Sequence, residues 1–332
     1  MDPVGEWVEQ RAKRGRRARG IALVCVSLAV ACRAPRDARE VLAGAATRED
    51  TAAVGATQQP HPGEVEPPGG AAAQRTLEEP LTATAAARGE AERDALAALT
   101  RADEAAAAGR ADATLHAAAA RALSTAADLR LQAALVARFR ATPAEEPGAL
   151  VRGEDSLDDE TRRAVEGLVR EASRQARAAL ALAPEDLAAR QDEAFADSLA
   201  AWAMGPTRAL MSGAGKRLPK LLAANREAGA TREDAAPLRL EGRFLCMAPW
   251  PVGDLARGTE ALAEAAGHAP TALNLMFLGD ARWLAGDAEA AGEAWRAAAT
   301  AAEGLDPSRD PAGVLVGWLA GQRVVAHQRV TR

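Results

Sequence analysis

Residue patterns that would support catalysis or metal binding are incomplete in this sequence. Residues 212–217 (SGAGKR) suggest a phosphate-binding loop, but the earlier glycine is missing and an arginine stands where Ser or Thr would bind Mg²⁺. The acidic residues 153–160 (GEDSLDDE) lack the central glycine of a calcium loop and suit the start of a helix instead. His116, His268 and His327 have no Cys or His at metal-ligand spacing. We therefore predict no catalytic residue, no metal and no cofactor, and hence a non-enzymatic protein.

One residue, Cys32, lies in a pattern that predicts a covalent modification. A basic segment, 11–20 (RAKRGRRARG), precedes an apolar run of about a dozen residues, 21–32 (IALVCVSLAVAC). This run is too short to cross a bilayer, which needs about 20 residues. Its end, LAVAC, resembles a bacterial lipobox, whose cysteine is acylated and becomes the mature N-terminus.

We therefore predict a signal peptide over residues 1–32 and a lipid anchor on Cys32, at the periplasmic face of the outer or inner membrane. Two alternatives stay open: an ordinary secretory signal in which Cys32 is incidental, and an uncleaved anchor. After cleavage and acylation, Cys246 is the one remaining free thiol, so no disulfide is expected within the chain.

Composition indicates an all-α protein with a core of small side chains. Of the 332 residues, 48% are apolar but only 3% are aromatic, and long Ala-Leu-Arg-Glu runs favour helices. The formal charge is -5 and a cluster of cations precedes Cys32, so the rest of the chain is acidic and has no basic stripe. This excludes nucleic acid as a partner.

Residues 33–85 mix Pro, Gly, Gln, Thr and Ala without periodicity, which predicts a disordered linker. A flexible chain of about 50 residues has a root-mean-square end-to-end distance of roughly 40 Å. The folded part would thus stand well away from its membrane.

From residue 86 to 332 the sequence predicts successive helices arranged in hairpins. Residues 273–299 (LNLMFLGDARWLAGDAEAAGEAWRAAA) place small and large residues in the order of a tetratricopeptide repeat, with the turn at Gly286-Asp287. The same pattern recurs 33 residues earlier, where four extra residues, 248–251 (APWP), enlarge the turn. We therefore expect a tetratricopeptide-like solenoid, closed by a final helix that turns Val314, Trp318 and Val325 inward.

The repeat pattern also assigns residues to the concave groove of such a solenoid. Counting from Gly242 and Gly279 gives a set of groove candidates: Arg239, Arg243, Cys246, Met276, Asp280 and Trp283. The arginines would bind a carboxylate of a solute or of a partner, or would only solvate a helix face. Trp250, between two prolines, either packs on its own repeats or is presented to a partner.

Residues from about 165 to 300 resemble a family of periplasmic lipoproteins, the T-component of TRAP transporters (TatT-like). The segments that carry the resemblance are ARAALALAPED, RALMSGAGKRLPKLLAANREAGA, APLRLEGRFLCMAPWPVGD and APTALNLMFLGDARWLAGD, with Asn274 in the last of them. The resemblance implies a non-enzymatic protein that docks a periplasmic substrate-binding protein or a small organic solute. The alternative is a scaffold lipoprotein of an envelope or secretion assembly that binds extended peptides.

Overall fold

The computed structural model describes residues 37–47, 70–153, 157–229, 231–249 and 251–331, and their regular elements are all α-helices. The predicted all-α class is confirmed. The helices are α2 (Ala38–Thr47), α3 (Gly70–Ala107), α4 (Ala113–Ala141), α5 (Pro147–Val151), α6 (Asp159–Leu182), α7 (Leu187–Met204), α8 (Pro206–Met211), α9 (Ala214–Gly229), α10 (Arg232–Met247), α11 (Leu255–His268), α12 (Ala272–Leu284), α13 (Ala288–Ala301) and α14 (Pro311–Val330).

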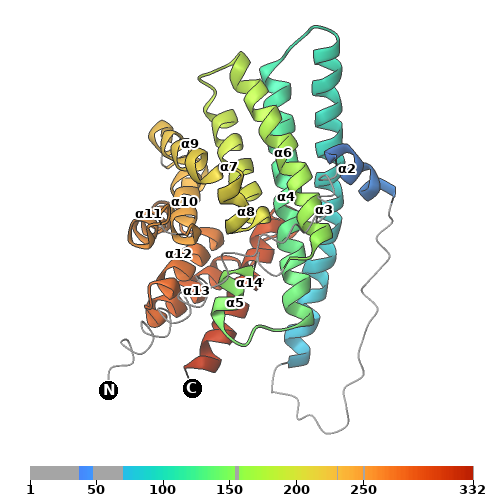
Figure 1. Ribbon diagram of the computed structural model, residues 1–332. Helices are drawn as coiled ribbons and strands as arrows, with labels where there is room; N and C mark the ends of the chain where they lie inside the picture. The colour runs from blue at the N-terminus through green and yellow to red at the C-terminus, as the bar shows by residue number, and fades with distance from the viewer. Residues whose placement is uncertain (1–36, 48–69, 154–156, 230, 250, 332) are drawn as a thin grey trace, which may run out of the picture. The chain divides into compact units, whose positions relative to one another are not determined.

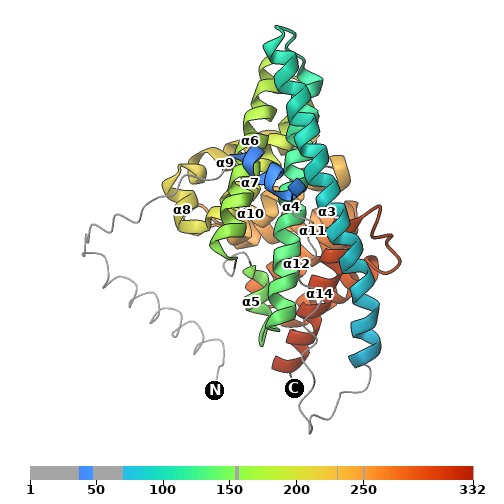
Figure 2. The same cartoon turned by 90° about the vertical axis from the view of Figure 1, so that its right-hand side faces the viewer.

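The long helices α3, α4 and α6 pack side by side, and α7 packs on α4 and α6 (Figures 1 and 2). Acidic N-caps start α4 and α6: Asp112 accepts from the Thr114 amide at 2.8 Å, and Asp158 accepts from the Thr161 amide at 2.7 Å. The contact surfaces are built largely from alanine and leucine, as the composition predicts. Small side chains let the helix axes approach closely.

The two hairpins expected from the repeat pattern are present, as α10 with α11 and α12 with α13. In the second hairpin, Gly286 has φ +89° and Asp287 caps α13 by accepting from the Ala290 amide at 3.1 Å. In the first, Asp254 caps α11 by accepting from the Arg257 amide at 3.1 Å. In the enlarged turn between α10 and α11, the Asp254 amide donates to the Leu245 carbonyl at 3.0 Å.

Glycines allow the two helices of each hairpin to touch. A Cβ added to Gly279 would lie 2.5 Å from Cδ1 of Trp295, a fully buried ring that cannot move aside. We therefore expect Gly279→Ala to lower the free energy of unfolding by about 1–3 kcal/mol, measured by urea denaturation. Gly267→Ala is the matched control, because its Cβ meets nothing within 4 Å. It should raise the stability by about 0.5–1 kcal/mol, and equal stability of the two variants would contradict this account of the hairpin interface.

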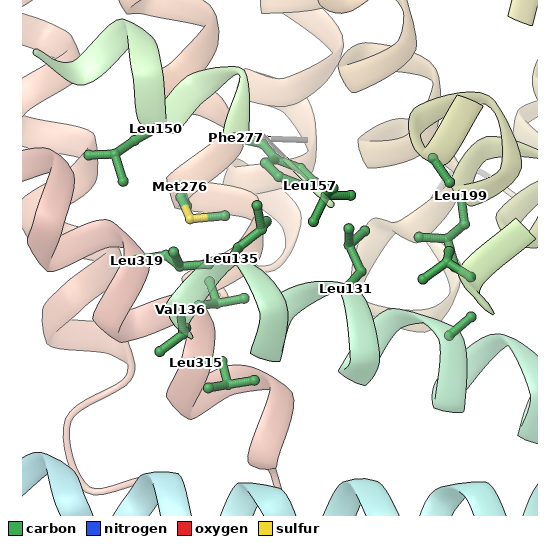
Figure 3. Packing of buried hydrophobic residues seen from close by; sticks show 14 of the residues in the cluster. Leu131, Leu135, Val136, Leu150, Leu157, Leu199, Met276, Phe277, Leu315 and Leu319 are labelled. Atoms are coloured by element: carbon green, nitrogen blue, oxygen red, sulfur yellow. The ribbon is translucent and has the colours of Figure 1, made fainter. Parts of the chain in front are cut away.

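The last helix, α14, returns to the N-terminal part of the fold. It packs on α12 and α13 and also on α3, α4 and α5. Leu315 and Leu319 of α14 lie in the same core cluster as Val136 of α4 and Met276 of α12 (Figure 3). A solenoid limits contacts to neighbouring repeats, so α14 is more than an end cap. The prediction that Val325 points inward is wrong, because this side chain is 42% exposed. The buried face of α14 carries charged and apolar side chains: Leu315, Val316, Leu319, Ala320, Arg323, Ala326 and His327.

The stretch expected as a linker, 33–85, differs from the prediction in two places. Residues 38–47 form α2, whose Ala38, Val41 and Leu42 are buried in the main core. The helix α3 already begins at Gly70. Apolar spacing at Ala38, Val41 and Leu42 gives α2 a face to bury, and the high content of Pro and Gly around it hides this short pattern. The signal segment, including Cys32, lies outside the described residues.

Candidate functional site

Three of the groove candidates are enclosed by the protein itself. Arg243 on α10 is 2% exposed, Asp280 on α12 is 0% exposed and Met276 is 4% exposed. The helices α5 and α14 both pack against α12 and cover this face. The expectation of an open groove at these positions is therefore wrong.

Asp280 is the centre of a buried ionic cluster. Its Oδ2 accepts from Nη1 of Arg243 at 2.9 Å, and its Oδ1 accepts from Nε of Arg323 at 2.7 Å and from Nε1 of Trp295 at 3.0 Å. The two arginines also reach carbonyl groups at the end of α5: Arg243 donates to Val151 and Arg323 to Leu150. This cluster is structural, since one carboxylate, that of Asp280, pairs with both arginines and all three side chains are closed to solvent.

Arg323 is the member of this cluster that sequence reasoning missed. The signal available was a single arginine inside the apolar helix GVLVGWLAGQRVVAH, where an unpaired charge would be costly. Arg323 and Asp280 are 43 residues apart in the sequence, so no local pattern indicates that they pair.

The remaining groove candidates are half-buried or undescribed. Trp283 packs its ring against Trp295 and His327, with centroids 5.9 and 6.2 Å away. Cys246 is half-buried, and burial raises the pKa of its thiol to about 11, so the thiol stays protonated at neutral pH. Trp250 lies outside the described residues.

Arg239 is the candidate that keeps hydrogen-bonding capacity. It is half-buried on α10, and only its Nη1 donates to described residues, to Oδ1 of Asn274 at 2.9 Å and to the carbonyl of Asp234 at 3.3 Å. Asn274 is fully buried and donates to the carbonyls of Asp234 and Ala269, so it holds α12 against both helices of the preceding hairpin. Arg239 is thus fixed at one nitrogen, with Nε and Nη2 left over.

Backbone strain is concentrated beside Arg239. Glu233, Asp234 and Ala235 have φ of 48°, 56° and 59°, a left-handed run without glycine. Each such residue costs roughly 1–2 kcal/mol. The run is held from outside, because Nη2 of Arg121 donates to Oε1 of Glu233 at 3.1 Å and Asn274 donates to the Asp234 carbonyl at 2.9 Å. Strain maintained by such contacts is typical of functional sites.

The helix α4 contributes a polar stripe with a spacing of four residues: Ser124, Asp128 and Gln132. Nε2 of Gln132 donates to Oδ2 of Asp128 at 2.8 Å. The Oγ of Ser124 and the Oε1 of Gln132 are buried and have no hydrogen-bond partner among the described residues. The polar stripe can be seen in the sequence as STAADLRLQ, residues 124–132 of an Ala-Leu helix. This stretch matches no catalytic or metal-binding motif.

Asp128 and Arg239 influence each other electrostatically. Burial raises the pKa of Asp128 to about 6, and both the bond from Gln132 and the charge of Arg239 act against this rise. Burial lowers the pKa of Arg239, while the carboxylates of Asp128, Asp234 and Glu233 oppose the change. Asp128 and Arg239 form no direct ion pair, so neither charge is fully compensated.

The patterns set aside in the sequence have structural roles. Asp158 in the acidic run caps α6, and Arg217 of the SGAGKR segment pairs with Asp197 at 3.1 Å. Nδ1 of His116 lies 2.5 Å from Oε1 of Gln175. Over the ranges that the structure describes, no His, Cys, Asp and Glu side chains cluster as metal ligands, and no helix has the length and apolar character to span a bilayer.

Comparisons with protein-family models and with curated proteins gave no match. The residues around Arg239 and the sequence pattern that ends at Cys32 are the features of this chain that bear on its function.

Proposed function

We propose that this chain is a lipid-anchored periplasmic lipoprotein that binds a ligand without catalysing a reaction. Cys32 would hold it on the outer or inner membrane. Tetratricopeptide-like hairpins would form its body, and its partner would be a small organic solute or a periplasmic substrate-binding protein of a TRAP-type transporter.

The observation that carries the binding role is the environment of Arg239. The other groove arginine, Arg243, is buried against Asp280, whereas Arg239 keeps Nε and Nη2 for a carboxylate. The strained run lies beside Arg239, and the charge of Asp128 on α4 acts on its guanidinium group.

The scaffold alternative receives less support from the structure. Docking an extended peptide in a tetratricopeptide groove needs exposed side chains along its first helices. At those positions Arg243, Met276 and Asp280 are buried by α5 and α14. A solute, or a short acidic segment of a partner, fits the remaining polar site better than an extended peptide.

The test is co-purification of the lipidated protein from native membranes, followed by mass spectrometry of bound proteins and bound small molecules. We expect a carboxylate-bearing solute or a substrate-binding protein that is retained by the wild type and by Asp94→Asn, an exposed change on α3. The Arg239→Gln variant should lose it, because its amide cannot form the paired contact with a carboxylate. An identical set of bound species in Arg239→Gln, with unchanged helical content by circular dichroism, would refute the proposed site.

A further inference from the structure

We propose that Arg239 and Asp128 together bind a small zwitterion, whose carboxylate pairs with Arg239 and whose ammonium group pairs with Asp128. This inference rests on the proposed function and specifies the chemistry of its ligand. It assigns recognition to the polar stripe of α4, which lies outside the repeat groove.

The carboxylate of the ligand would be bound by the guanidinium group of Arg239, whose geometry fixes how it can bind. Nη1 of Arg239 is occupied by Asn274 and by the Asp234 carbonyl. Nε and Nη2 donate to no residue that the structure describes, and they are the two nitrogens of the side-on edge, which donates two parallel hydrogen bonds to a carboxylate. Because Asn274 is buried and itself held by two carbonyls, this edge is oriented before any ligand arrives.

The ammonium group of the ligand would be bound by acceptor oxygens on α4 that receive no hydrogen bond from the described residues. Oδ2 of Asp128 accepts from Gln132, while Oδ1 has no donor among the described residues. The Oε1 of Gln132 belongs to the amide group that bonds Asp128, and the Oγ of Ser124 lies one turn away on the same face. Ser124 is 1% exposed and Gln132 is 7% exposed, so these unsatisfied oxygens are costly unless a ligand donates to them. An ammonium group offers three N–H donors.

The balance of charge favours a zwitterion over a simple organic anion. Four carboxyl groups act on the two arginines of this site: Asp128, Glu233 and Asp234 act on Arg239, and Asp192 and Glu233 act on Arg121. A monoanion on Arg239 would add to the excess of negative charge in a desolvated place. A zwitterion adds no net charge and supplies a partner to both Asp128 and Arg239, which attract each other without direct pairing.

Calorimetric titration of the full-length protein with a chain-length series tests this proposal. The probes are glycine, β-alanine, 4-aminobutyrate and 5-aminovalerate, each compared with the carboxylic acid and the amine of the same length. We expect one amino acid of the series to bind saturably, and about 10-fold or more tightly than either monofunctional counterpart, since a charged hydrogen bond contributes about 1.5–3 kcal/mol. The variants Asp128→Asn and Arg239→Gln should each weaken this binding by at least about 10-fold.

Folding is checked by circular dichroism and urea denaturation of each variant, with Asp94→Asn as the surface control. Asp128→Asn should be at least as stable as the wild type, because it replaces a carboxyl group whose pKa is raised by burial. Its loss of binding therefore cannot be attributed to unfolding. Equal affinity for the amino acid and the plain acid, or unchanged binding in Asp128→Asn, would overturn the zwitterion while leaving the proposed solute-binding function intact. Absence of binding by all four amino acids would also overturn it, and co-purification then decides the wider proposal separately.

Discussion

Replacing Asp280 by asparagine is expected to lower the free energy of unfolding by at least about 4 kcal/mol, or to prevent folding. The carboxylate is fully buried and compensates two buried arginines, Arg243 and Arg323. An amide of the same size would remove the negative charge and leave both guanidinium groups with carbonyl oxygens as acceptors. Removal of one partner from a buried ion pair typically costs 3–5 kcal/mol, and here two pairs share the same partner.

Urea denaturation followed by circular dichroism measures this effect. The control, Asp94→Asn, makes the same chemical change at an exposed position of α3 and should stay within about 0.5 kcal/mol of the wild type. A loss of less than about 1 kcal/mol in Asp280→Asn would show that the cluster is solvated and that the repeat groove is open after all. Since Trp295 also donates to Asp280, its fluorescence should change in the folded variant if one is obtained.

The second large effect is expected at the N-terminus, where Cys32→Ser should stop acylation and processing. Serine has no thiol to receive the diacylglycerol group, so the protein would lose its lipid anchor. Each buried CH₂ of an acyl chain contributes about 0.8 kcal/mol, and more than one chain gives stable attachment to a membrane. Labelling with a radioactive fatty acid and the electrophoretic mobility of the product measure both steps.

Cys25→Ser is the matched control, because this cysteine lies in the same apolar run and should be removed with the signal peptide. It should leave labelling, processing and membrane attachment unchanged. A Cys32→Ser protein that is processed and membrane-bound to the same extent as the wild type would refute the lipoprotein proposal.

Local features of the fold were predictable from the sequence. The turn at Gly286-Asp287 requires a residue that adopts positive φ followed by a helix cap, and both signals are contained in two adjacent residues. The close contact of Gly279 with Trp295 was likewise expected from the alternation of small and large residues in one hairpin. These interactions span few residues, so the sequence pattern records them directly.

Contacts between distant helices could not be read from the same pattern. Arg323 donates to Leu150 and to Asp280, and neither partner lies near it in sequence. The pairing places Arg323 inward, and this turns Val325 toward solvent against the hydrophobic pattern of α14. The prediction that Arg243 lines a groove assumed that the repeat helices leave one face open. In the structure α14 and α5 pack on α12, and they cover that face.

The candidate site was predictable only at Arg239. Its ligand-binding partner in our proposal, Asp128, lies on α4, far from the repeat segments that suggested a groove. A four-residue polar spacing in an alanine-rich helix is equally typical of a solvated face. The absence of hydrogen-bond partners for Ser124 and Gln132, which distinguishes the two cases, becomes visible only in the packed structure.

The lipid anchor underlies the proposed membrane-bound role, and mass spectrometry of the mature protein from native membranes tests it most directly. We predict that the N-terminal peptide begins at Cys32 and carries a diacylglyceryl group. A mature N-terminus at another residue, or an unmodified Cys32 within a longer chain, would contradict the account.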